Sequence, residues 1–92
     1  MAIGIRVRMP GGTAAMFDRV NELIGADTNP PEGLIFHASG PVDGGWQAID
    51  FWESRAHFDR FAEERIGPAI MSVGATGIPD VEQFEVHEHF PR

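Results

Sequence analysis

The feature that most constrains the fold of this chain is a strand that runs directly into a capped helix, over residues 44–70 (GGWQAIDFWESRAHFDRFAEERIGPAI). Gln47, Asp50 and Glu53 interrupt an otherwise apolar strand. Ser54 stands at the expected N-cap, where a hydroxyl accepts a hydrogen bond from a free backbone N–H. Phe58, Phe61, Ala62, Arg65 and Ile66 then recur at helical spacing. A half-buried strand followed by an amphipathic helix predicts a mixed α and β fold.

The other segments extend this pattern. Residues 3–9 alternate as a strand does. A helix is expected between Thr13 as N-cap and Gly25 as terminator. Residues 34–40 and 46–53 predict a hairpin, and residues 81–90 a last strand. Gly67 and Pro68 should kink or restart the second helix, because proline lacks the amide hydrogen and clashes with the preceding turn.

The order β-α-β-β-α-β predicts an α+β fold of the ferredoxin-like type. Right-handed crossovers give a four-stranded antiparallel sheet with two helices on one face. We expect one domain, residues 1–92, with the spatial strand order fourth, first, third, second. The uncovered face is expected to carry Trp46 and Trp52, and a large exposed apolar face implies a partner.

Composition excludes several functions. The net charge is −7, with seven arginines and no lysine, which opposes nucleic-acid binding because phosphate contacts need basic side chains. The absence of cysteine excludes disulfides and Cys-based metal sites. Without a leader pattern or a long apolar run, a soluble cytoplasmic protein that does not enter membranes is expected. A small domain without disulfides often oligomerises, which favours a homodimer.

The hairpin allows faces to be assigned, because directly opposed residues share a face. If Gly40 opposes Trp46, then His37 opposes Ile49, Ile35 opposes Phe51, and Phe36 opposes Asp50. Ile49 and Phe51 then face the helices, and His37 points into the space between sheet and helices beside Gln47 and Ser39. A shift of one residue would reverse this assignment.

His37 is the candidate catalytic residue. Its near-neutral pKa suits a general acid or base, and burial beside apolar side chains would lower that pKa. The alternative is a half-buried structural histidine bonded to a backbone carbonyl. The walls of a pocket between sheet and helices are predicted to be Ser39, Gln47, Ile49, Phe51, Phe17, Phe58, Phe61 and Met71.

The remaining polar residues suggest structural roles. Arg6 and Arg8 are expected beside Asp50 and beside Glu85 or His87, as an ion-pair network in preference to an anion site. Glu85, His87 and His89 alternate on the last strand, but no second shell supports them, so we predict no metal site. His57 is expected to face solvent. The serines form no nucleophile motif, and Ser54 is needed as a cap.

The segment of residues 44–70, preceded by the strand GLIFHASGP, resembles the dimeric α+β barrel proteins of the antibiotic biosynthesis monooxygenase superfamily, most closely its small actinobacterial members without assigned activity. The resemblance covers nearly the whole chain. It implies a homodimer in which two sheets face each other with the helices outside. It also implies a small apolar or aromatic molecule bound between sheet and helices.

The resemblance implies two enzymatic activities. One is cofactor-independent oxygenation, or a related cyclisation, of an aromatic polyketide-like substrate, with His37 as acid or base and Ser39 and Gln47 as hydrogen-bonding neighbours. The other is haem degradation, whose members use an Asn, a Trp and a His. It is disfavoured because no Asn lies on the first strand, Trp52 precedes the second helix, and that helix has no late histidine. We therefore expect no cofactor.

A non-catalytic dimer that binds a small molecule, or serves as an accessory protein, is the alternative function. Few titratable groups converge in the predicted pocket, which favours this alternative. A fully bonded His37 in a filled core would support it, whereas an open cavity that exposes His37 would support an enzyme.

Overall fold

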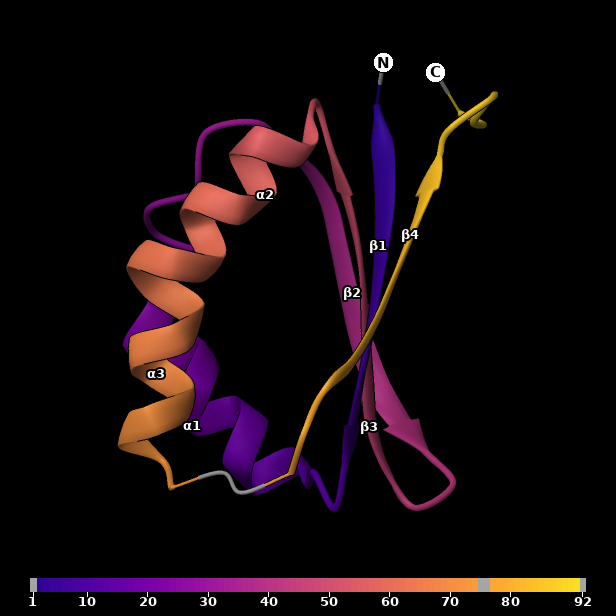
Figure 1. The fold of residues 1–92 in the computed structure, drawn as a ribbon. Helices are drawn as coiled ribbons and strands as arrows, with labels where there is room; N and C mark the ends of the chain where they lie inside the picture. The colour runs from indigo at the N-terminus through magenta and orange to yellow at the C-terminus, as the bar shows by residue number, and fades with distance from the viewer. Residues whose placement is uncertain (1, 75–76, 92) are drawn as a thin grey trace.

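The computed structural model describes residues 2–74 and 77–91. A layer of helices covers one face of a four-stranded antiparallel sheet with the order β2-β3-β1-β4, which confirms the predicted fold and strand order (Figure 1). The elements are β1 (Ile3–Pro10), α1 (Ala14–Ile24), β2 (Leu34–Val42), β3 (Gly45–Trp52), α2 (Arg55–Phe61), the π-helical turn η1 (Ala62–Ile66), α3 (Gly67–Ser72) and β4 (Asp80–Glu85).

Both predicted helix starts are confirmed. The Thr13 hydroxyl accepts a hydrogen bond from the backbone N–H of Met16 at 3.2 Å, and the Ser54 hydroxyl accepts one from His57 at 3.3 Å. These bonds satisfy amides that have no partner inside the helix. Gly25 ends α1 in the left-handed conformation at φ 67°, which glycine adopts without steric cost.

The predicted interruption at Gly67 and Pro68 takes the form of a π-helical turn. The Gly67 amide donates to the carbonyl of Ala62, five residues earlier, and α3 begins at Gly67 without a turn between the two segments. The wider turn makes room for Pro68, which cannot donate a backbone hydrogen bond. As a result α2, η1 and α3 form one continuous helical column (Figure 1).

The predicted register of the β2–β3 hairpin is wrong by one residue. His37 pairs with Asp50 and Ser39 with Ala48, and the strands remain paired to Val42 and Gly45. The prediction ended β2 at Gly40, so Pro41 fell in the connection between the two strands. β2 is an edge strand, however, where a missing donor costs no bond when that side of the strand faces outward.

This shift exchanges the two faces of β3. Trp46 and Trp52, predicted on the open face, point toward the helices, whereas Ile49 and Phe51, predicted toward the helices, lie on the open face. Trp52 is fully buried and its ring centroid lies 5.9 Å from that of Phe58 and 5.3 Å from that of Phe61. The core forms around it, from Ile3, Ile5, Trp52 and Phe58, with Val7, Leu34, Phe61, Ala62 and Ile66 packed against them.

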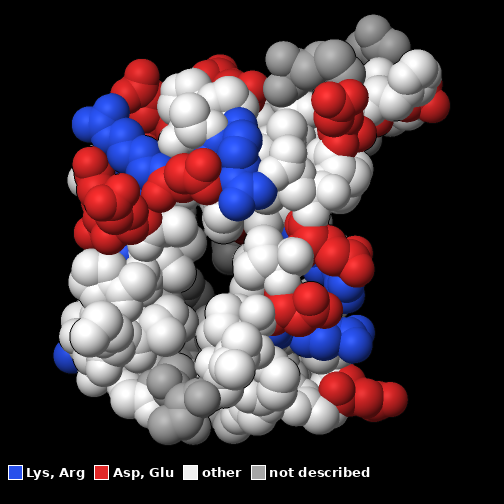
Figure 2. Space-filling model, viewed as in Figure 1, with Lys and Arg blue, Asp and Glu red and all other residues white. Residues whose placement is uncertain are grey.

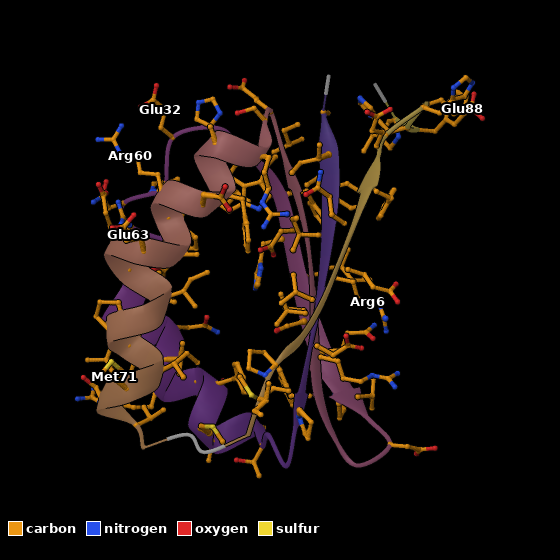
Figure 3. The ribbon with its side chains drawn as sticks, in the orientation of Figure 1. Arg6, Glu32, Arg60, Glu63, Met71 and Glu88 are labelled. Atoms are coloured by element: carbon orange, nitrogen blue, oxygen red, sulfur yellow. The ribbon has the colours of Figure 1, made fainter. Side chains whose placement is uncertain are left out.

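The open face is divided into an aromatic half and a charged half. Phe36 and Phe84 are 58% and 49% exposed, and the Phe84 ring lies edge-on to Phe51 at 6.2 Å. In the charged half, Arg6 points away from the helix layer (Figure 3). Its guanidinium lies 2.9 Å from Glu82, and Asp80 is 3.8 Å away.

The ion-pair network around Arg6 is therefore present, but with other acids than predicted. Asp50 and Glu85 pair with Ile5 and Ile3, so they share the helix-facing side of the sheet with those two residues. β4 ends at Glu85, before His87 and His89, so the predicted strand to Phe90 is too long. Within residues 2–74 and 77–91, no three histidines or acids are grouped as metal ligands.

Candidate functional site

The candidate site is built on a hydrogen bond between His37 and Asp50. His37 Nδ1 bonds to Asp50 Oδ1. The two residues lie opposite each other on β2 and β3, so they share the helix-facing side of the sheet. The Asp50 side chain is 7% exposed and that of His37 is 42% exposed. A buried carboxylate thus holds one edge of an imidazole whose other edge is accessible.

The hydrogen bond to Asp50 raises the pKa of His37 above its ordinary value. Burial of the ring opposes this rise, and the negative charge of Asp50 adds to it. Because Nδ1 is bonded to Asp50, Nε2 is the nitrogen left to exchange a proton with a ligand. The pair therefore has the geometry of an oriented acid–base group.

The strand pairing extends the site across the whole sheet. His37, Asp50, Ile5 and Gln83 oppose one another in turn, and we call these four residues the dyad row. The next row toward the hairpin is Ser39, Ala48, Val7 and Val81, which we call the floor row. Both rows face the helices, since they include Ile5 and Val7, which belong to or pack against the core.

The space between the floor row and the helices is not filled by side chains. Ser39 is exposed and Val81 is 45% exposed, although both lie on the helix-facing side. The surface is hollowed between the helix layer and the sheet (Figure 2). We call this space the interlayer hollow. The floor row carries short side chains, three of the four of them apolar, and the dyad row lies directly beside it.

The predicted pocket residues divide into three groups. Ser39 lies on the floor row, on the helix-facing side of the sheet. Phe58 is buried in the core, Phe61 packs on Trp52, and Phe17 stacks on Trp46 at 5.8 Å. The remaining positions are corrected: Gln47, Ile49 and Phe51 lie on the open face, and Met71 is 82% exposed and points away from the sheet (Figure 3).

His57 does not face solvent as predicted. Its side chain is half-buried, its Nδ1 lies 2.6 Å from the Ser54 hydroxyl, and its ring packs so closely on Gly33 that no side chain would fit there. It lines a cleft of about 300 Å³ whose lining residues include neither His37 nor Asp50. The other lining residues are Asn29, Pro30, Pro31, Glu32, Arg60, Phe61, Glu64 and Arg65.

Sequence reasoning missed Asp50 as a member of the site. It placed this residue on the opposite face of the sheet because the hairpin register was wrong by one residue. A signal was present, since an acid inside a strand that is buried on one face needs a partner. Among the neighbouring strand positions, His37 carries the complementary side chain.

Comparison with known proteins shows that the fold occurs in other solved structures. Neither a family model nor a curated protein matches the sequence. Solved structures match along the whole chain. They include SnoaB, a cofactor-independent oxygenase from Streptomyces nogalater, at 18% identity over 99% of this chain and 97% of that one, with a TM-score of 0.67.

Two further structures match as well. A candidate antibiotic biosynthesis monooxygenase from Caulobacter crescentus is 17% identical over 95% of this chain and 91% of that one, with a TM-score of 0.75. A protein of unknown function from Nitrosomonas europaea is 19% identical over 96% and 91% of the two chains, with a TM-score of 0.74. The resemblance predicted from the sequence is thus confirmed for the fold. No helix within the described residues is long and apolar enough to cross a membrane.

Proposed function

We propose that this protein binds a flat aromatic molecule in the interlayer hollow and acts on it with His37 as general base. The observation that carries the proposal is the bonded His37–Asp50 pair, in which the imidazole remains 42% exposed and which lies in the row next to the floor row. Asp50 is a positioning residue, because it orients the ring and stabilises the imidazolium that forms when His37 takes a proton.

The reaction proposed is cofactor-independent oxygenation of an aromatic polyketide-like substrate. His37 Nε2 removes a proton from an activated ring CH₂ group, and the resulting carbanion, delocalised as an enolate, reacts with O₂. For a CH₂ group the balance is R₂CH₂ + O₂ → R₂C=O + H₂O, so both oxygen atoms and the four electrons lost by carbon are accounted for. The fold shared with SnoaB supports this class of reaction over others.

The test is oxygen uptake with dithranol, an anthrone, as the probe. Wild type is expected to accelerate uptake over the uncatalysed rate, and His37→Gln should reduce this acceleration by about 10²–10⁴-fold, the usual contribution of a general base. His57→Gln is the matched control, because His57 lies at a helix cap outside the site. Equal rates for the two variants would refute the role of His37.

The alternative is a non-catalytic binding protein. It is supported by the small number of titratable groups, since His37 is the only histidine on the helix-facing side of the sheet among the described residues. Calorimetric binding of dithranol under anaerobic conditions, without oxygen uptake in air, would favour this function over catalysis.

We further propose that a second copy of the chain covers the open face. The exposed Phe36 and Phe84 and the mixed charges around Arg6 make a face that is both apolar and self-complementary in charge. Sedimentation should give twice the chain mass of 10.1 kDa. Phe36→Glu should give the single-chain mass, whereas Met71→Glu, at an exposed apolar position on α3, should leave the dimer intact. A wild-type protein that sediments as a single chain would refute the dimer.

A further inference from the structure

We propose that Arg55 determines the specificity of the site, by selecting ligands that present a neutral carbonyl oxygen at the β4 end of the interlayer hollow. The inference rests on the proposed function, since it names the class of ligand that the same hollow takes. It concerns the end of the hollow that lies opposite His37.

Arg55 bridges the helix layer and the sheet at the β4 edge. It is the first residue of α2, and its guanidinium lies over the Phe58 ring at 5.6 Å from the centroid. Its Nε donates to Asp59 at 2.7 Å, and its Nη1 donates to the side-chain oxygen of Gln83 on β4. Arginine and acidic side chains gather at the upper rim of the hollow (Figure 2).

Arg55 and His37 mark the two ends of the site. Gln83 is the β4 member of the dyad row and His37 is its β2 member. Three strand spacings separate them, which is about 14 Å between backbones. A fused-ring ligand lying on the floor row would therefore meet the proposed base at one end and the Arg55 guanidinium at the other.

The charges at the β4 end favour a neutral acceptor over an anion. The oxygen that Arg55 now holds belongs to an amide, so a ligand carbonyl is its closest chemical equivalent. Asp59 already balances the guanidinium, and Glu85 lies two residues beyond Gln83 on the same face. An anionic ligand would thus face two carboxylates and one guanidinium, whereas a ketone or quinone oxygen would bring no further charge.

Two variants of this bridge should act in opposite directions. Arg55→Gln removes the charged donor, so it should weaken binding of a carbonyl ligand. Gln83→Ala removes the internal acceptor that competes for the same N–H, so it should strengthen that binding. Arg60→Gln is the matched control, because Arg60 forms the same i to i+4 ion pair, with Glu64, on the same helical column.

The probes are 9-fluorenone, fluorene and 9-fluorenone-2-carboxylate, which share one ring skeleton. Binding can be followed by quenching of Trp46 and Trp52, which face the helices. Arg55→Gln should weaken fluorenone binding by about tenfold or more, as expected for a hydrogen bond to a charged group. Fluorene binding should not change, and the carboxylate should bind wild type more weakly than fluorenone.

The outcomes separate this inference from the proposed function. If Arg55→Gln affects fluorenone and fluorene equally, or Gln83→Ala weakens fluorenone, the role of Arg55 is refuted even where His37→Gln abolishes oxygen uptake. If the Arg55 pattern holds but His37→Gln leaves oxygen uptake unchanged, the proposed catalysis fails and the carbonyl site stands. Failure of all three probes to bind wild type would refute the role of Arg55, whereas the proposed catalysis is decided separately by dithranol oxygen uptake. Thermal unfolding of each variant checks that it remains folded.

Discussion

The two faces of the sheet differ in what covers them and in how their polar side chains are held. On the helix-facing side, Asp50 is buried and bonded to His37. On the open face, Arg6 is paired with acids that are themselves about two-thirds exposed. The same strands supply both faces through alternate residues. A polar group in a strand therefore has a different role according to its face, and adjacent residues can belong to the core and to the surface.

The largest expected difference between the faces is in stability, at the neighbouring positions Trp52 and Phe51. Trp52→Ala removes a fully buried ring and should lower the free energy of unfolding by about 3–5 kcal/mol. Phe51→Ala, on the half-buried open face, should cost only about 1 kcal/mol. Urea titrations at low protein concentration measure both values. Similar losses at the two positions would contradict the face assignment.

The next effect is the pH dependence that the helix-facing pair confers. Because the folded pKa of His37 is raised, His37 stabilises the protein fully below its unfolded pKa of about 6.5 and loses this contribution as pH rises through the folded value. The gap in unfolding free energy between wild type and His37→Gln should therefore shrink as pH rises from below about 6.5 through the raised folded pKa of His37. Oxygen uptake should rise over the same interval, since a general base must be neutral.

Asp50→Asn is the control for this pH dependence. It removes the charge that favours the imidazolium, so the pH-dependent part of the gap should fall and the rise in oxygen uptake should move to lower pH. If the difference in unfolding free energy between wild type and His37→Gln does not change with pH, the pairing of His37 with Asp50 is contradicted.

The smallest expected effect lies on the open face. Arg6→Gln breaks an ion pair whose arginine side chain is 25% exposed, and it should cost no more than about 1 kcal/mol, less at high salt. Arg19→Gln breaks an ion pair with Glu22 on α1, in which both side chains are exposed. It should lower the free energy of unfolding by less than Arg6→Gln does. Thermal unfolding of the two variants at low and high salt provides the comparison. If Arg6→Gln lowered the free energy of unfolding as much as Trp52→Ala does, the two faces of the sheet would contribute equally to stability.

Local features were predicted correctly because they depend on near neighbours in the chain. The caps at Thr13 and Ser54 each join residues three positions apart, and Gly25 ends its helix through its own conformational freedom. The orientation of His37 toward the helices was also predicted correctly, but the residue opposite it on β3 was not. Its partner Asp50 lies thirteen residues away, on a strand whose register depends on how far Pro41 extends the hairpin.

By itself, the sequence determined the order of strands and helices, their caps and the topology of the sheet, since periodicity and short-range hydrogen bonds are written along the chain. Only the tertiary structure decided that His37 meets Asp50, that Gln83 meets Arg55, and that the tryptophans lie under the helices. The physical reason is the two-residue period of a strand: a shift of one residue leaves every local preference satisfied and still exchanges the two faces.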